Sequence, residues 1–116
     1  MSDAVTNFNE YRSRMNDKLL DDASMTLKRI FSLDNQAYKA GSLDVATKEL
    51  LGLVASMVLR CDDCVKYHLE NCYKEHLTKN QVMEALEIAT VVGGSIVIPH
   101  LRRAYEYWEA LESQTK

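Results

Sequence analysis

The fold is decided by residues 48–68, which read KELLGLVASMVLRCDDCVKYH. The part from Leu50 to Leu59 is ten consecutive uncharged residues, the most uniformly apolar run in the chain. A helix that is apolar on nearly all sides belongs in the middle of a bundle or in a subunit interface. We therefore expect a buried helix from Asp44 to about Leu59, with the other helices arranged around it.

The composition indicates one all-helical domain. The chain has 116 residues, 47% of them hydrophobic, with one proline and four glycines. Helix formers such as Ala, Leu, Glu, Lys and Met dominate, and the length suits a single domain. We predict an all-α fold, a compact bundle of five or six helices. It forms one domain over residues 1–116, with a core at about 22–112 and an N-terminal helix within 1–20.

Charge and hydropathy exclude several functional classes. The formal net charge is −3 and both signs are interspersed, without a basic stripe that would favour nucleic acid or an anionic membrane. No secretory signal is visible, and the longest uncharged run is too short to span a bilayer. We expect a cytoplasmic protein. In the reducing cytosol a Cys-x-x-Cys pair is more often catalytic, redox-active or metal-binding than a static crosslink.

Helical spacing and end signals divide the chain. Apolar residues recur at helical spacing over 8–19, 25–38, 82–92 and 97–111, and residues 61–75 read as a further helix, whereas residues 1–7 carry no clear pattern. We expect Asp21 and Asp22 to cap the helix that follows them, Gly41 to take a C′ position, and Asp44 to be an N-cap, with Ser42 competing for that place. We further expect a capping box of Thr78 and Gln81, a break at Gly93-Gly94, and Pro99 either at a kink or in a first turn.

Two cysteines and a histidine share one face of the helix that follows the apolar run. At 100° per residue, Cys61, Cys64 and His68 fall within about 60° of one another, and Cys64 and His68 are four residues apart. We place Cys61 in the first turn, where unpaired N–H groups favour a thiolate, and an imidazole can take the thiol proton. A thiolate attacks a peroxide oxygen or a disulfide sulfur, and a second cysteine can then form a disulfide.

Glu49 lies on the apolar helix, where a carboxylate is costly without a partner. His68, one helix away, is a reasonable partner, and a carboxylate that orients an imidazole beside a thiol has the logic of a catalytic triad. The alternative is a salt bridge at the helix surface, with Lys48 or with Arg60 of a neighbouring subunit.

Other interpretations of the polar residues stay open. Cys61 and Cys64 can also hold a metal, with His68, Glu49 and Cys72 as the only obvious further ligands, or they can be buried structural residues. No cofactor motif is present, and we expect neither a cofactor nor a metal. Cys72 fits a small buried hydrophobe. We expect His76 to be a helix-end residue and His100 a surface or interface residue.

Together these features resemble the carboxymuconolactone decarboxylase superfamily, in its alkylhydroperoxidase D-like branch. The resemblance covers about Ile30 to Leu111. It rests on Lys-Glu-Leu, the apolar run, Cys-x-x-Cys-x-x-x-His, Thr-x-x-x-Val-x-Glu-Ala-Leu and Gly-Gly. In that branch a glutamate precedes the first cysteine by twelve residues and a histidine follows the second by four, which are the spacings of Glu49 and His68.

The resemblance implies an all-helical homotrimer or homohexamer that acts as a thiol-dependent oxidoreductase. Carried over, Cys64 attacks, Cys61 resolves, and Glu49 and His68 form the proton relay, whereas helix-dipole reasoning alone favours Cys61 as the more activated thiol. The substrate would be a small hydroperoxide, giving an antioxidant peroxidase, or a disulfide. A dithiol or a protein would donate the electrons.

Three departures from the pattern leave rival functions open. The branch often has a histidine where this chain has Asp63, a glycine where it has His76, and alanine where it has Cys72. Asp63 adds negative charge that disfavours a thiolate, which favours a non-catalytic redox-sensing or assembly module. A decarboxylase-type lyase is the other alternative, although the lactone decarboxylases generally lack the cysteine pair.

Overall fold

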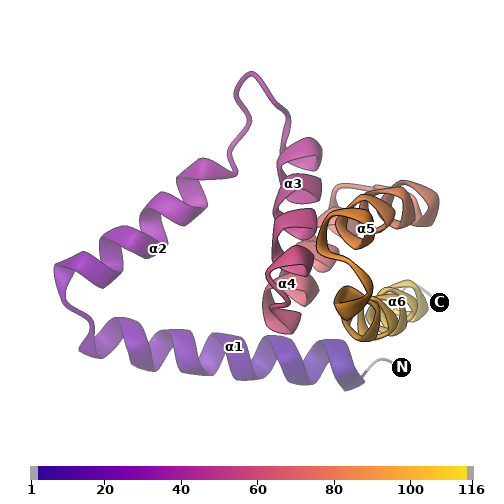
Figure 1. Cartoon of the computed structure of the whole chain (residues 1–116). Coiled ribbons are helices and arrows are strands. Elements are labelled where there is room, and N and C mark those ends of the chain that lie inside the picture. The colour runs from indigo at the N-terminus through magenta and orange to yellow at the C-terminus, as the bar shows by residue number, and fades with distance from the viewer. Residues whose placement is uncertain (1–2, 115–116) are drawn as a thin grey trace.

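The computed structural model describes residues 3–114, which form six α-helices, one short 3-10 helix and no strand. This confirms the prediction of an all-α bundle of five or six helices. In chain order the elements are α1 (Asp3–Asp22), α2 (Met25–Ala37), α3 (Val45–Val58), α4 (Asp62–Lys74), α5 (Lys79–Gly93), η1 (Ser95–Val97) and α6 (Ile98–Ser113) (Figure 1).

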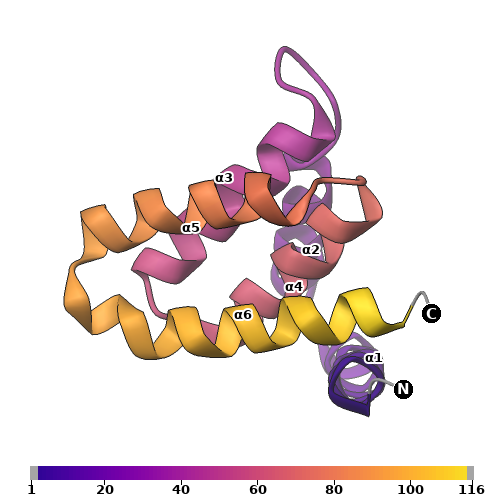
Figure 2. The ribbon, with the colours of Figure 1, turned by 90° about the vertical axis from the view of Figure 1, so that its right-hand side faces the viewer.

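The apolar run forms the helix at the centre of the bundle, but only one of its faces is buried within the chain, and Leu51 on another face is 56% exposed. It becomes α3, which packs most extensively against α4 and α5, while α4 also packs against α6. Figure 2 shows α5 and α6 running in opposite directions and joined at one end by η1. No helix within residues 3–114 combines the length and the apolarity needed to cross a membrane. The core is built from Val5, Leu53, Met57, Val65, Leu69, Cys72, Val82, Leu86, Ala89, Val97, Ala104, Tyr107, Trp108 and Leu111.

The start of the chain differs from the expectation. Residues 1–7 gave no periodic signal, yet α1 begins at Asp3 and Val5 is only 2% exposed; residues 1 and 2 lie outside the described part. Phe8 contributes an edge-on ring contact with Tyr107 of α6, with ring centroids 6.1 Å apart. One valine facing the core fixes the first turn of α1, and a single residue cannot produce a periodic pattern.

Helix α2 has no buried residue, although its apolar spacing predicted a packed helix. Its side chains of Met25, Ile30 and Leu33 are 61%, 56% and 62% exposed. Figure 1 shows α2 leaning away from α3 and joined to it by the loop before Val45. The apolar face of this helix is therefore not covered within the chain.

Several helix ends follow the sequence signals. Asp44 is the N-cap of α3 and accepts a 2.8 Å hydrogen bond from the amide of Thr47. Thr78 and Gln81 form the expected capping box at the start of α5. Pro99 lies in the first turn of α6 and therefore does not kink it. At this position the missing N–H of proline removes no helical hydrogen bond.

Two end signals were wrong. Asp21 and Asp22 do not cap α2, because α1 continues through Asp22 and Ser24 takes the N-cap position. Gly41 is not the C′ residue of α2, which ends at Ala37 with Tyr38 as its C-cap. The carbonyl of Ala37, the last residue of α2, accepts from Nζ of Lys48, a contact between distant residues that short-range sequence patterns do not encode.

Candidate active site

The two cysteines lie at the turn between α3 and α4. Arg60 takes a left-handed conformation (φ 61°), and Cys61 is the N-cap of α4, one position before the helix in which it was expected. The Cys61 sulfur accepts a hydrogen bond from the Cys64 amide, with an N···S distance of 3.3 Å. Asp62 and Asp63 occupy the first helical turn. The cap position keeps a backbone N–H group directed at the Cys61 sulfur.

Cys61 and Cys64 are joined as a disulfide, with their Cα atoms 5.3 Å apart. Cys64 is exposed, whereas Cys61 is half-buried. The three-residue spacing across a helix N-terminus thus brings the two sulfur atoms together without any rearrangement of the helices.

Glu49 of α3 and His68 of α4 meet in the interior. Oε1 of Glu49 lies 2.7 Å from Nδ1 of His68, and the two residues are only 4% and 7% exposed. An ionised carboxylate can only accept, so beside it Nδ1 carries the hydrogen, and Nε2 has a free lone pair whenever the ring is neutral. Lys48, the alternative salt-bridge partner for Glu49, instead donates to the carbonyls of Ala37 and Lys39.

Tyr38 is a site residue that sequence analysis missed. Its hydroxyl oxygen lies 3.4 Å from Nε2 of His68, and the two rings have centroids 5.2 Å apart. Gly52 makes room for this contact, because a Cβ atom there would lie 2.6 Å from the Tyr38 hydroxyl and 2.6 Å from Cε1 of His68. A glycine inside an apolar helix costs roughly 0.5–1 kcal/mol relative to alanine, so Gly52 is the sequence signal that could have indicated a close approach of other side chains to α3.

Cys64 and His68 share a cavity of about 320 Å³. Within the described residues no hydrogen bond joins Cys64 to His68, whose ring nitrogens are occupied by Glu49 and Tyr38. Asp63 also borders the cavity and is exposed, so its charge lies beside the reactive pair. The lining residues are Phe8, Tyr11, Arg12, Asp34, Asp63, Cys64, Tyr67 and His68, from α1, α2 and α4.

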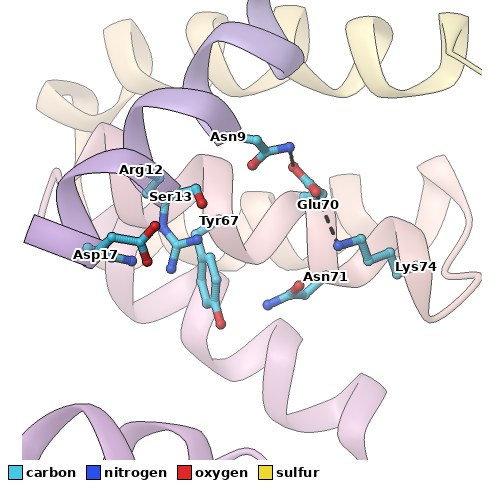
Figure 3. A pocket seen from close by; sticks show the side chains of 9 residues that line it. Asn9, Arg12, Ser13, Asp17, Tyr67, Glu70, Asn71 and Lys74 are labelled. Carbon is cyan, nitrogen blue, oxygen red and sulfur yellow. Dashed lines mark hydrogen bonds and ion pairs between the residues drawn. The ribbon is translucent and has the colours of Figure 1, made fainter. Parts of the chain in front are cut away.

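A second, polar cavity of about 460 Å³ borders the first, between α1 and α4 (Figure 3). Arg12 and Tyr67 line both cavities, and the Arg12 guanidinium carbon lies 4.2 Å from the centroid of the Tyr67 ring. Glu70 accepts from Asn9 at 2.8 Å and pairs with Lys74 at 3.2 Å. The sequence did not predict this polar cavity, because the two helices that line it, α1 and α4, lie far apart along the chain.

A second histidine–carboxylate pair lies next to Cys61 in sequence. Oδ1 of Asp62 is 2.7 Å from Nδ1 of His100, and Oδ2 accepts from Nε of Arg103 at 2.9 Å. Burial alone would raise the pKa of Asp62, but hydrogen bonds and charges from His100 and Arg103 hold it below the ordinary value. His100, expected at a surface or interface, retains 18% side-chain exposure and ties α6 to the start of α4.

The remaining cysteine and histidine have structural positions. Cys72 is fully buried, which confirms the expectation of a small core residue, and burial followed by the charges of Glu49 and Glu75 raises its pKa to about 12. His76 follows Glu75, the C-cap of α4, and has the left-handed conformation (φ 63°) that glycine favours after a helix end. Residues 3–114 contain no group of three or more His, Cys, Asp or Glu placed to hold a metal ion.

Comparison with known proteins adds a family and two kinds of relative. The model of the carboxymuconolactone decarboxylase family matches residues 26–107. The crystal structure of TM1620 from Thermotoga maritima is similar with a TM-score of 0.93 and 53% identity, over 94% of this chain and 96% of that one. A carboxymuconolactone decarboxylase family protein from Legionella pneumophila, in its apo form, has a TM-score of 0.81 at 28% identity, over 99% and 100% of the two chains.

A shorter match extends to a named enzyme. The alkyl hydroperoxide reductase AhpD of Corynebacterium kroppenstedtii is 40% identical over 52 residues, which are 45% of this chain and 30% of that protein. The chain therefore aligns with less than a third of this enzyme.

Proposed function

The chain belongs to the carboxymuconolactone decarboxylase family, and on that basis we propose that it is an alkylhydroperoxidase-like, thiol-dependent oxidoreductase. It reduces a small hydroperoxide, or exchanges a disulfide, through Cys61 and Cys64. The observation that carries the proposal is the joined cysteine pair, one member of which shares a cavity with a histidine held by a buried carboxylate.

The proposed cycle starts from the dithiol. The Cys64 thiol gives its proton to His68, and the thiolate attacks the outer oxygen of the hydroperoxide, breaking the O–O bond. The released alkoxide takes a proton and leaves as an alcohol, and Cys64 becomes a sulfenic acid. Cys61 then attacks the Cys64 sulfur, water leaves, and the disulfide forms. An external dithiol or a reduced protein supplies two electrons and two protons to restore the pair.

The positions of the two sulfurs support Cys64 as the attacking residue. Cys64 is exposed and lines the cavity with His68, whereas Cys61 is half-buried and outside that lining. The Cys61 sulfur already accepts the Cys64 amide, which stabilises an anion there. Such a sulfur suits a resolving and leaving group, because a stabilised thiolate leaves a disulfide more readily.

We further propose that the chain assembles into a homotrimer or homohexamer. Support comes from an apolar groove of about 670 Å³ between α3 and α5, in which Leu51, Ile88 and Val92 are more than half exposed. Contiguous apolar surface of this kind marks an interface. The groove is lined by Thr47, Leu50, Leu51, Val54, Ala55, Val58, Leu59, Ala85, Ile88 and Val92.

One observation favours a second function, that of a redox sensor without turnover. Asp63 is exposed on the cavity beside Cys64 and adds a negative charge where a thiolate must form. Like charges disfavour ionisation of a thiol. A sensor would form the disulfide once with peroxide and return slowly to the dithiol.

The test is peroxide consumption with dithiothreitol as electron donor, using wild type, Cys64→Ser, Cys61→Ser and the control Cys72→Ala. We expect Cys64→Ser to fall to the rate of the dithiol alone. Cys61→Ser, treated with one equivalent of peroxide in the absence of dithiothreitol, should accumulate a sulfenic acid on Cys64, detected by mass spectrometry after trapping. Cys72→Ala should keep wild-type turnover, because Cys72 is buried away from the cavity.

Three results would separate the alternatives. Turnover that neither serine substitution changes would sink the proposal and point to a decarboxylase-type lyase or another chemistry. Formation of the disulfide with one equivalent of peroxide, without repeated turnover, would support the sensor. Loss of turnover in Cys64→Ser, with repeated turnover in the wild type, supports the enzyme.

A further inference from the structure

Two residues hold the His68 imidazole, one at each ring nitrogen. Glu49 lies 2.7 Å from Nδ1 and Tyr38 lies 3.4 Å from Nε2. We propose that Tyr38 is a positioning residue of the thiol site, whose hydroxyl fixes the outer nitrogen of His68 opposite Glu49. This inference rests on the proposed function, in which His68 takes the proton of Cys64.

A hydroxyl suits this position because it can reverse its role. When the ring is neutral, the Tyr38 hydroxyl donates to the Nε2 lone pair; when the ring is protonated, the same oxygen accepts from Nε2–H. The Glu49 carboxylate accepts from Nδ1–H in both states. To let Nε2 take a proton, the hydroxyl turns its own hydrogen away and then accepts from Nε2–H, so the ring stays bonded at both ends with little reorientation.

The contact between the two rings is built into α3. Gly52 faces the meeting point, and a Cβ atom there would lie 2.6 Å from the Tyr38 hydroxyl and 2.8 Å from Nε2 of His68. Heavy atoms that are not bonded do not approach so closely, so any larger residue would push the rings apart. The central helix thus has its one glycine where Tyr38 and His68 meet.

Lys48 fixes the segment that carries Tyr38. Its Nζ donates to the carbonyls of Ala37 at 2.9 Å and of Lys39 at 2.6 Å, the residues on either side of Tyr38. Helix α2 has no buried residue, so its own packing does not hold Tyr38 in place. The residue that holds this segment is adjacent in sequence to Glu49, and both partners of His68 are therefore positioned from one turn of α3.

Among the described residues, Tyr38 is the group that contacts Nε2 of His68 at hydrogen-bond distance. Tyr67 approaches the imidazole edge-on, with ring centroids 5.3 Å apart, and it makes no hydrogen bond to the ring in the described structure. Three charged residues border the shared cavity: Asp34 from α2, Asp63 from α4 and Arg12 from α1. Burial, and then the charges of Glu49, Asp34 and Tyr67, raise the pKa of Tyr38, so its hydroxyl keeps its proton at neutral pH and can donate it.

The direct test is NMR of ring-15N-labelled histidine in the oxidised protein at pH 8, with His68 identified by His68→Gln. A lone-pair nitrogen that loses a hydrogen-bond donor resonates further downfield. We expect the Nε2 signal of His68 to move downfield in Tyr38→Phe, which keeps the ring and the fold. Gly52→Ala should give the same direction of shift if it folds, as judged by circular dichroism. The control Tyr105→Phe removes a hydroxyl bound by Lys79, outside the cavity lining, and should leave the signal in place.

The second readout is the single-turnover reaction of the reduced protein with hydrogen peroxide between pH 6 and 9. Loss of one hydrogen bond to the ring predicts a rate about fivefold lower near neutral pH in Tyr38→Phe. The deficit should shrink at high pH, where the thiol ionises without help from His68. A uniform deficit at every pH would show a merely structural effect and overturn the inference.

The outcomes separate this inference from the function on which it rests. An unchanged Nε2 signal in Tyr38→Phe overturns the positioning role, even if the protein reduces peroxides. A shifted Nε2 signal supports the contact between Tyr38 and His68. Whether the protein is the proposed enzyme is then decided by the peroxide turnover of the serine variants. Shifts of equal size in Tyr38→Phe and Tyr105→Phe would mean a general change in the fold and would also overturn the inference.

Discussion

Asp62 ties the start of α4 to α6 through its contacts with His100 and Arg103. Its pKa lies below the ordinary value, so its carboxylate favours the folded state at every pH above that ordinary value, about 4. This contribution is lost as the pH falls through the lower folded value, because the carboxyl is then protonated in both states.

We therefore expect Asp62→Asn to lower the free energy of unfolding by about 0.5–1 kcal/mol at pH 7, a small figure because the side chain is partly exposed. Urea unfolding of the oxidised protein at pH 7 and pH 3 measures it, and the difference from wild type should be smaller at pH 3 than at pH 7.

Asp63→Asn is the matched control, because Asp63 lies in the same helical turn but makes no ion pair in the described structure. It loses the interaction with the helix dipole alone. Equal losses in the two variants would mean that the contacts to His100 and Arg103 contribute nothing.

The sequence could predict the site residues that lie on two consecutive helices, α3 and α4, and at the turn between them. Glu49, Cys61, Cys64 and His68 follow from helical spacing and from the cost of a carboxylate on an apolar helix, and the structure brings Glu49 and His68 into contact. Tyr38 could not be found in this way, because it is 30 residues from His68 and lies at a helix end that no periodicity describes.

At the scale of the helices, two N-caps make a matched comparison. The Thr78 hydroxyl accepts from the Gln81 amide at 3.2 Å and Gln81 binds back to the Thr78 amide at 2.8 Å, whereas Ser24 at the start of α2 makes no side-chain cap bond. Thr78→Ala should lower the free energy of unfolding by about 1 kcal/mol.

Ser24→Ala should change stability much less, because no cap bond is lost. Both values come from urea unfolding followed by circular dichroism at 222 nm. A cost for Ser24→Ala that equals the cost for Thr78→Ala would contradict the assignment of the cap bonds.

The helices also show where sequence patterns stop being informative. Periodicity located α2, but it could not reveal that the apolar face of Met25, Ile30 and Leu33 is left uncovered by this chain. Apolar spacing indicates that one face of a helix is hydrophobic, but it does not indicate which surface covers that face. The start of α1 was missed for the opposite reason, since Val5 alone faces the core there.

For the whole molecule, the exposed apolar groove between α3 and α5 predicts self-association. Size-exclusion chromatography with light scattering should give a trimer or hexamer of the 13.2 kDa chain. Ile88→Glu combined with Val92→Glu places two charges in the groove and should shift the mass toward the monomer, because burying unpaired carboxylates is costly.

Asn80→Glu adds a charge at the exposed start of the same helix and should keep the wild-type mass. A wild-type protein that is monomeric at tens of micromolar, or a double variant with unchanged mass, would contradict this assembly surface.

The cap at the start of α4 has a consequence for the molecule as a whole. The Cys61 sulfur, which the proposed cycle oxidises and reduces, accepts the Cys64 amide in the first turn of this helix. A thiolate accepts a hydrogen bond more strongly than a disulfide sulfur does. Oxidation state and helix stability are then linked: reduction of Cys61 to a thiolate strengthens this cap, and a stronger cap shifts the equilibrium toward that reduced form by the same free energy.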